Sequence, residues 1–404
     1  MLGVLAFILL LGFFINLYWS PILARTVKST VLRSSDSLYR INFTKADLHI
    51  LQGKIVVFNL DLQPDSAVYH RRQKLGTAPN NLYHLHIKKL VLQHVHPFRL
   101  YFKKKLDIGD IILSAPEIRI SYQLNHARDT TNKSRRTFYE QISKTLRSIH
   151  VAHLALNDVK FKYEDYSGHK LAISELKEMN ISATDMLVDS ATQTDTTRFM
   201  YCRDVVTEIN NFSGRAANGL YSYKMKLLKL STGTSQLNIQ HLELEPIAAG
   251  KFFAKSPHDR FTLQIDSVCL NHFDYLSYHK YRMVNASSMI LSKGRLSVFT
   301  NYNKPEKHTD RYATFPNAGI YKLKTDLKID TVLLDDIDVI YSEVNKKSHK
   351  PGSVSFNHAT GKVLNLTTNA AALKKEPDCR ITLTSLFMNK AKLHTSFVFN
   401  LVDK

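Results

Sequence analysis

The sequence predicts a mainly β protein that follows an apolar N-terminal helix, and three observations lead to this prediction. Residues 1–24 carry no charged side chain. One broken alternation of apolar and polar residues recurs along the rest of the 404-residue chain. Apolar residues make up 44% of the chain while glycine and proline are few, which is the composition of a folded protein and not of a disordered one.

Residues 1–28 are predicted to form a membrane anchor. The apolar run from Leu2 to Trp19 approaches the thickness of a bilayer core when it is helical. An aromatic pair then stands where an interfacial belt is expected, and basic residues follow. A cleaved signal peptide usually begins with positive charge and has a shorter apolar core, so an uncleaved anchor is favoured. The side chains predicted to hold the anchor in the membrane are Leu2, Phe7, Leu10, Phe13, Phe14 and Trp19.

The stretch IHVAHLALNDVKFKY, residues 149–163, shows the recurring pattern most clearly. Its apolar residues are spaced by two, three, two, three and two, whereas a helical face needs steps of three and four. Two doublets, Ala152-His153 and Asn157-Asp158, break the strand alternation, and each break flips the side-chain parity. A β-bulge or tight bend at each doublet would return the next apolar pair to the same face. The pattern therefore predicts short strand pieces on one curved, one-sided sheet.

Similar copies begin at other points of the chain. The copies at Leu85 and Leu106 start 21 residues apart, and the next copy starts 43 residues after Leu106. These intervals, near multiples of about 21 or 22, suggest hairpin-sized units. The further copies begin at Leu263 and Leu327, with a shorter copy at Leu237 and a faint one at Ile41.

The charge balance is strongly basic, with 55 Lys and Arg against 35 Asp and Glu. Such a balance favours anionic membrane surfaces, nucleic acid or acidic glycans, or simply reflects a solvated surface. The basic runs, such as Lys103 to Lys105, lack the aromatic interleaving of a nucleic-acid module, so no nucleic-acid partner is predicted. Cys202, Cys269 and Cys379 are far apart, and neither a disulfide framework nor a zinc ribbon fits them.

No motif of a hydrolase, nucleotide-binding protein or metalloprotease occurs, and no enzyme is predicted. Two pairs of histidines at i, i+2 spacing could meet across a hairpin and bind zinc, but they occupy polar positions of the repeated pattern. His272 with Asp274 has no associated nucleophile, and the acidic run near Asp336 lacks the glycine and distal glutamate of a calcium loop. No metal and no cofactor is therefore predicted.

One soluble helix is predicted at 137–148, where apolar residues step by four along one face. A charged polar loop precedes this helix and the clearest copy of the pattern follows it. The chain is therefore divided into the anchor at 1–28, a first β segment at 29–136, the short amphipathic helix, and a continuing β segment at 149–404.

A sheet with one apolar face must bury that face, and one soluble helix is too little to cover it. Three solutions remain open: a sandwich, a closed barrel, or a sheet bent into a trough whose apolar lining is covered by a ligand. A leucine-rich solenoid is excluded because its regular period with intervening helices is missing.

In layout the chain resembles a known family. The resemblance is carried by the apolar N-terminal segment, the strand pair YRINFTKADLHILQGKIVVFNLDLQPD, copies such as LHIKKLVLQHV, the helix TFYEQISKTLRSI running into IHVAHLALNDVKFKYED, and the late strand KLHTSFVFNLVDK. Together these resemble the AsmA-like proteins of Gram-negative envelopes, over most of the chain and at the level of pattern. The resemblance implies an elongated, bent antiparallel β-sheet, open as a trough with a hydrophobic groove, with one or two short helices. It also implies kinship with bridge-like lipid-transfer proteins.

The resemblance further implies a single-pass inner-membrane protein with the bulk of the chain in the periplasm. The basic residues Arg25, Lys28 and Arg33 follow the anchor, and the positive-inside rule would keep them cytoplasmic. Long domains, however, translocate largely regardless of such charges.

The leading hypothesis is a membrane-anchored envelope protein that binds lipid acyl chains in a hydrophobic β-groove and has a role in phospholipid transfer or outer-membrane integrity. Its expected partners are membrane phospholipids and, as a second class, other envelope proteins. The alternative is a non-catalytic structural or assembly factor of the envelope with a closed β-sandwich core. The candidate groove-lining residues are Leu85, Ile87, Leu154, Leu156, Leu263, Ile265, Val332 and Leu334.

Overall fold

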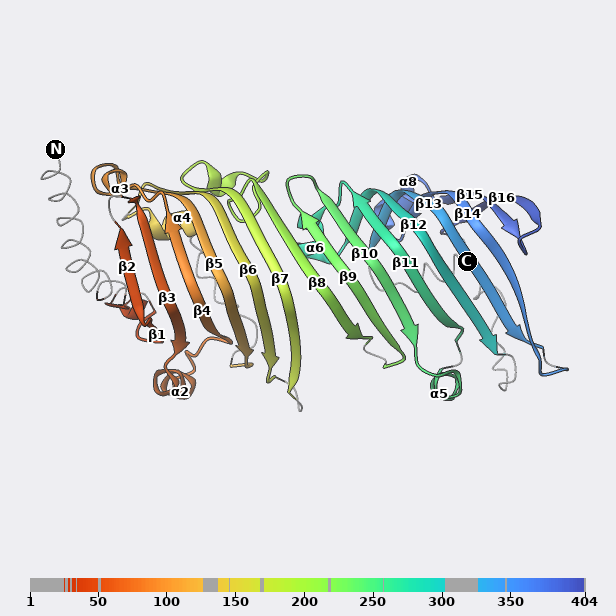
Figure 1. The fold of residues 1–404 in the computed structure, drawn as a ribbon, viewed down its shortest axis with the longest axis horizontal. Helices are drawn as coiled ribbons and strands as arrows, with labels where there is room; N and C mark the ends of the chain where they lie inside the picture. Colours follow the sequence, from red (N-terminus) through yellow and green to blue (C-terminus); the bar gives the residue numbers. More distant parts are fainter. Residues whose placement is uncertain are drawn as a thin grey trace, which may run out of the picture. The chain divides into compact units, whose positions relative to one another are not determined.

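The computed structural model describes residues 25, 28–29, 31–33, 35–49, 52–125, 137–144, 146–167, 171–216, 219–256, 258–301, 326–345 and 347–402. The fold is mainly β, as predicted, with 16 strands in one mixed sheet whose strand order is open (Figure 1). The chain divides into two compact units, unit 1 (Met1–Ile209) and unit 2 (Asn210–Lys404). The division falls within β8 (Asp204–Arg215), so each unit is described by itself.

The predicted membrane anchor lies almost wholly outside the described residues, and all six of its named side chains do. In the part of the chain that the structure describes, no helix is both long and apolar enough to cross a bilayer. The anchor therefore stays a prediction, as do the predicted segment boundaries at residues 28 and 136.

In unit 1, β1 and β2 both pair with β3, and the order then continues through β4, β5, β6 and β7 to β8. The bounds are β1 Tyr39–Asn42, β2 Lys45–His49, β3 Lys54–Pro64, α2 Ser66–Lys74, β4 Asn81–Gln93, α3 Pro97–Lys103, β5 Lys105–Tyr122, α4 Phe138–Ile142, β6 Ser148–Asp165, β7 Ala172–Val188 and the 3₁₀ turn η2 Thr192–Thr194.

In unit 2, the strands follow their chain order from β9 to β16. The bounds are β9 Tyr221–Ser231, β10 Gln236–Pro246, α5 Ala249–Lys255, β11 Arg260–Asn271, α6 Tyr275–Tyr281, β12 Val284–Asn301, β13 Leu327–Val344, β14 Pro351–Thr367, α8 Ala370–Lys375, β15 Asp378–Phe387 and β16 Ala391–Asn400.

The prediction of an antiparallel sheet is wrong at one strand pair in each unit. In unit 1, β5 and β6 are parallel, and Ser148 pairs with Lys105, 43 residues earlier. In unit 2, β12 and β13 are parallel, and Leu327 pairs with Val284, again 43 residues earlier. The interval of 43 is therefore a parallel register and not two hairpins. With this parallel register, a point where one strand interrupts its alternation of apolar and polar residues lies beside the corresponding point of the neighbouring strand.

One of the two predicted bends in residues 149–163 is confirmed. Asp158 is left-handed, with φ of 57°, and the register of β6 with β7 shifts on both sides of Val159. At Ala152-His153 the flanking pairs Val151 with Met186 and His153 with Thr184 show no register shift, so the structure has no bulge there, and the alternative, a tight bend, stays a prediction. At that level the left-handed residue is Asp185, on the neighbouring strand β7.

Left-handed residues line up across the strands of each unit. In unit 1, Ala115 on β5 lies beside Asp158 on β6, since the pairs Ser114 with Asn157 and Glu117 with Lys160 flank them. In unit 2, a corresponding line is formed by Lys293, Asp336 and His358 on β12, β13 and β14. L-residues rarely adopt this conformation, so its repetition at one level marks a shared bend of the strands.

The predicted helix at 137–148 is shorter than expected. Helix α4 contains five residues, and Thr137 begins it with a capping box to Glu140. The N–H of Arg147 already donates to the carbonyl of Lys104, at 2.7 Å, so the chain has joined the sheet before the predicted helix end. The prediction of one or two helices is also wrong: the described residues include α2, α3, α5, α6 and α8, each too short to show a helical period in the sequence.

Alanine in place of Gly361 should destabilise unit 2. Gly361 on β14 has φ of 151°, and a Cβ there would lie 2.1 Å from the carbonyl oxygen of Thr382. Because that oxygen belongs to the backbone of β15, we expect Gly361→Ala to lower the free energy of unfolding by about 2 kcal/mol. Urea unfolding of the full chain, followed by far-ultraviolet circular dichroism, measures the change.

Gly352→Ala is the matched control in the same strand, because a Cβ at Gly352 meets nothing within 4 Å. Equal losses of stability in the two variants would contradict the close approach of β14 and β15 at Gly361.

Candidate functional site

The candidate site of unit 2 is one apolar face of its sheet, which we call the inner face of unit 2. It consists of four rows of side chains that run across the strands, each row following the pairing of residues between neighbours. The first row is Tyr223, Leu244, Leu263, Leu296, Val339, Phe356 and Phe387. The second is Leu242, Ile265, Gly294, Ile337 and Ala359. The third is Ile239, Val268, Leu291, Leu334, Gly361 and Leu383. The fourth is Leu237, Leu270, Met289, Val332, Val363 and Ile381.

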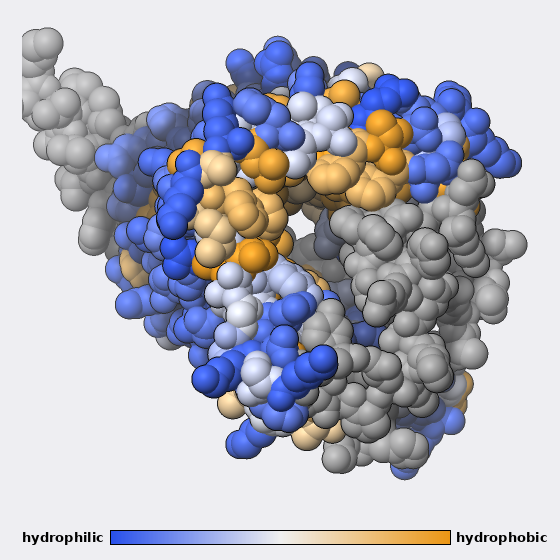
Figure 2. All heavy atoms as spheres, turned by 90° about the vertical axis from the view of Figure 1, so that its right-hand side faces the viewer, coloured by the Kyte–Doolittle hydropathy of each residue, from blue (hydrophilic) through white to orange (hydrophobic). Residues whose placement is uncertain are grey.

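The rows differ in burial. The second row follows the line of left-handed residues, and Ile265, Ile337 and Ala359 are buried there. Together with Val268 and Leu270 of the next two rows, Ile265 and Ile337 form one hydrophobic cluster. Every residue of the first row from Tyr223 to Phe356 is only half-buried, and Phe387 is exposed. Figure 2, seen from the side of β14 to β16, shows apolar side chains on the hollowed side of the sheet and hydrophilic ones outside.

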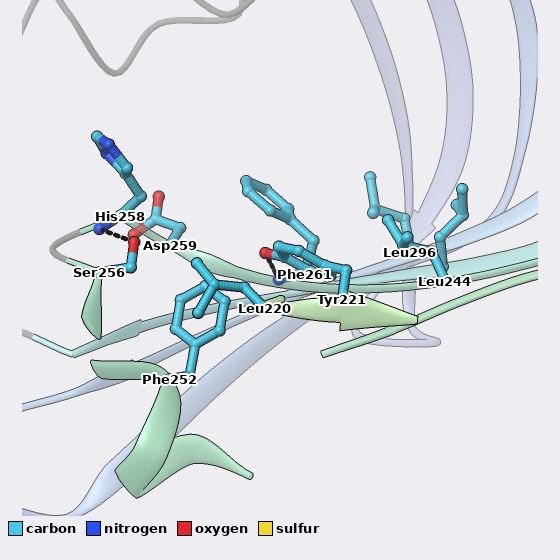
Figure 3. A pocket seen from close by; sticks show the side chains of 10 residues that line it. Leu220, Tyr221, Leu244, Phe252, Ser256, His258, Asp259, Phe261 and Leu296 are labelled. Atoms are coloured by element: carbon cyan, nitrogen blue, oxygen red, sulfur yellow. Dashed lines mark hydrogen bonds between the residues drawn. The ribbon is translucent and has the colours of Figure 1, made fainter. Parts of the chain in front are cut away.

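A pocket of about 480 Å³ adjoins the β9 to β12 part of the first row. Three of its lining residues, Leu244, Leu263 and Leu296, belong to that row. Figure 3 shows Phe261, Leu244 and Leu296 projecting from the sheet on one side, with His258 and Asp259 at the far end of the pocket. Its volume lies within the usual range of small-molecule sites, about 300 to 1,000 Å³.

Aromatic packing holds the base of this pocket. Phe252 and Phe253 of α5 are buried against Leu220, and Phe252 meets Tyr221 edge to face at 5.5 Å. The Tyr221 hydroxyl accepts a hydrogen bond from the N–H of Phe261, at 3.3 Å. Burial raises the pKa of Tyr221 above its ordinary value. In the sequence, the signal for this packing is the adjacent phenylalanine pair.

The polar residues of the pocket are engaged in structural hydrogen bonds. Asp259 accepts from the Thr300 hydroxyl at 2.8 Å, and the Ser256 hydroxyl accepts from the N–H of His258 at 3.2 Å. These contacts do not assemble a nucleophile with a base. Burial also raises the pKa of the thiols of Cys202, Cys269 and Cys379, which keeps them protonated and unreactive.

Three of the four histidines in the two i, i+2 pairs lie beside aspartates. His84 and His86 both approach Asp61, at 3.1 and 3.7 Å, and His94 lies 2.9 Å from Asp110. Among the described residues, no three such groups are placed to hold a metal ion. His272 and Asp274 do not meet: His272 hydrogen-bonds Ser287, and Asp274 caps α6.

Unit 1 presents an equivalent apolar face of four rows, which we call the inner face of unit 1. The first row is Ile41, Leu62, Leu85, Ile118, Phe161 and Leu176. The second contains Leu60, Ile87 and Pro116, and continues as Val159 and Met179. The third is Val57, Leu90, Leu113, Leu156 and Ile181. The fourth is Ile55, Leu92, Ile111, Leu154 and Ala183.

The predicted lining residues of each unit share its inner face. In unit 1, Leu85, Ile87, Leu156 and Leu154 lie in the first, second, third and fourth rows. In unit 2, the corresponding residues are Leu263, Ile265, Leu334 and Val332, each 178 positions later in the chain. Ile87, Ile265 and Val332 are buried, so they form the floor; the other five are half-buried.

Some residues of the inner face of unit 2 escaped the sequence prediction. The whole of β12 repeats the pattern, from Val284 to Val298, but Ala286 and Gly294 replace large residues in it. Phe356 and Phe387 extend the first row beyond β13. The place of these two residues in the row depends on the strand register, which the sequence does not show.

Ion pairs join polar side chains of neighbouring strands in both units. In unit 1, burial opposes ionisation of Asp107, but hydrogen bonds from His150 and Arg99 outweigh it and hold the pKa of Asp107 below its ordinary value. In unit 2, the left-handed residues Asp336 and His358 meet at 2.7 Å. The hydrogen bond to Asp336 raises the pKa of His358 above its ordinary value.

Comparison with protein-family models and with curated protein sequences gave no match for this chain. The resemblance to AsmA-like proteins therefore stays a prediction that rests on the pattern of the sequence.

The His358 imidazole should titrate above the ordinary histidine pKa of about 6.5. A folded-state pKa above the unfolded value means that this pair stabilises the fold fully below about pH 6.5, and that the contribution is lost as pH rises through the folded pKa. Histidine-labelled NMR titration, with the signal assigned by His358→Gln, measures the pKa. Asp336→Asn should return it towards the ordinary value, and an unchanged pKa in that variant would rule out the assigned cause.

Proposed function

We propose that this protein is a membrane-anchored envelope protein that binds lipid acyl chains on its apolar inner faces and transfers or chaperones phospholipid without catalysis. The observation that carries the proposal is the first row of the inner face of unit 2. It is apolar on seven successive strands, yet half-buried or exposed. In monomeric soluble proteins, a contiguous apolar surface of this kind usually marks a ligand or partner site.

The energetics suit lipid. Each acyl CH₂ group removed from water contributes about 0.8 kcal/mol. Seven strands about 4.8 Å apart give the first row a length of roughly 29 Å, enough for many such groups. The row carries no charged side chain that would fix one position, so a bound chain could slide along it.

The open strand order supports a trough more than a closed core. The main contacts of each described strand are with its neighbours in the sheet, and the order ends at β1 and β16 without closing. The inner-membrane anchor, the periplasmic location and a role in outer-membrane integrity are proposed on the resemblance to AsmA-like proteins.

Site-specific photocrosslinking tests acyl-chain binding in the full chain. Leu263→p-benzoylphenylalanine places the crosslinker on the inner face, and Gln264→p-benzoylphenylalanine places it on the opposite face one residue away. Irradiation in cells, followed by mass spectrometry of the purified protein, should give a phospholipid adduct at position 263 and none at 264. Adducts at both positions or at neither would contradict the proposal, and a protein adduct at 263 would favour the structural or assembly role.

A charge in the first row should block lipid while leaving the fold intact. Leu296 pairs with Leu263 and is half-buried, so Leu296→Glu can keep its carboxylate in solvent. We expect this variant to reduce lipid crosslinking at position 263 at least several-fold with an unchanged circular dichroism spectrum. Gln264→Glu, an exposed position on the opposite face, is the matched control and should leave crosslinking unchanged.

Ile265→Glu marks the contrasting case. Ile265 is buried in the hydrophobic cluster, and an unpaired charge there costs several kcal/mol, so this variant should lose its folded structure. If Leu296→Glu unfolded the protein equally, the first row would be core and not lining.

A further inference from the structure

Helix α3 exposes an unusual concentration of aromatic side chains. Phe98, Tyr101 and Phe102 are 77%, 83% and 74% exposed in a helix of seven residues. The rings of Tyr101 and Phe102 meet edge to face with their centroids 5.1 Å apart, so the two side chains form one projecting group. Aromatic side chains this exposed are costly in water unless another surface covers them.

The charges around this aromatic group are cationic. Arg99, Lys103, Lys104 and Lys105 lie within or directly after α3, and residues 97–105 contain no acidic residue. Asp107 neutralises Arg99, but no ion pair of the described residues engages the three lysines. Exposed aromatic side chains beside lysines are the combination that binds at the interface of an anionic bilayer.

Helix α3 lies at one end of the strands of unit 1. Gly53 precedes β3, and its carbonyl accepts from the N–H of Val95, just before α3, at 2.9 Å. Asp65 follows β3 and caps α2, so α2 and α3 lie at opposite ends of this strand. The 11 residues of β3 separate the two ends by roughly 36 Å.

The N-terminal part of the described chain runs from the level of the middle of β3 to the α2 end of that strand. Leu38 lies at the α2 end, where its carbonyl accepts from the N–H of Asp65. Lys28, however, lies 5.3 Å from the ring centroid of Phe43, and the adjacent Thr44 bonds to Phe58 in the middle of β3. The apolar residues 1–24 precede this segment in the sequence.

Helix α6 of unit 2 occupies the equivalent place between β11 and β12, 178 residues after α3. Both helices end in a left-handed basic residue, Lys104 in α3 and Arg282 in α6. In α6 the Arg282 guanidinium lies over the ring of Tyr278, at 5.6 Å, so its charge and that ring are already engaged with each other. Of these two described helices, only α3 combines three highly exposed aromatic side chains with a run of lysines.

We infer that α3 is a membrane-docking element, which inserts Phe98, Tyr101 and Phe102 into the interface of an anionic lipid bilayer while Lys103, Lys104 and Lys105 contact the head groups. This docking does not depend on the inner faces binding acyl chains. It would place the α3 end of the unit 1 strands at the membrane surface.

A tryptophan reporter tests the contact in the full chain. The protein has one tryptophan, Trp19, so Trp19→Phe with Phe102→Trp leaves a single reporter on α3. Leu75→Trp is the matched control: Leu75 is 69% exposed and follows the basic helix α2, but lies at the opposite end of β3. Each protein is reconstituted into phosphatidylcholine vesicles with brominated acyl chains, with and without phosphatidylglycerol.

The reporter at position 102 should be quenched several-fold more than the reporter at position 75, and more strongly when phosphatidylglycerol is present. Lys103→Glu with Lys104→Glu and Lys105→Glu should remove the dependence on phosphatidylglycerol. Equal quenching at the two positions, or equal quenching in both lipid mixtures, would overturn the inference. So would blue-shifted emission that depends on protein concentration without lipid, which would assign α3 to contact between protein copies.

The reporter at position 102 reads only α3, whereas the crosslinker at position 263 reads only the inner face of unit 2. The two results can therefore fail separately.

Discussion

The parity of side chains along a strand is the constraint on which the rest of this structure depends. Successive residues of a strand point to opposite faces, so any skipped residue moves all later side chains to the other face. In this chain the apolar residues skip by three at regular points. They share one face only if every neighbouring strand changes parity at the same level. Left-handed residues at matching levels, such as Asp158 beside Ala115, meet that condition.

The bends decide which part of the apolar face is core and which part stays open. Side chains that directly follow the bend are buried, as Val159 is in unit 1 and Ile337 in unit 2. Farther from the bend, Leu85 and Leu263 are half-buried in their rows. In each unit the second row thus contributes buried core, while the first row stays half-buried.

The strands, their shared apolar face and one of the bends could be predicted from the sequence, because they follow from the spacing of apolar residues within about 15 positions. The direction of neighbouring strands could not be predicted. A copy of the pattern that starts 43 residues later is compatible with two successive hairpins and equally with one parallel strand pair. The sequence prediction also missed α3 and α6, because seven residues are too few for a helical period to emerge. The exposure of Phe98 and Phe102 could not be foreseen either, since an aromatic run next to a strand ordinarily indicates core.

The parallel pairing of β5 with β6 has a kinetic consequence. Both strands begin at the α3 end of unit 1, so the 25 residues between Tyr122 and Ser148 must carry the chain back along the full strand length before pairing can start. Pairings that require such a long return close more slowly than hairpins. A newly made chain would therefore present β5 as an unpaired edge while the return is completed. Unit 2 repeats this delay at β12, so we expect each unit to have one slow step and one interval of exposure to misassociation.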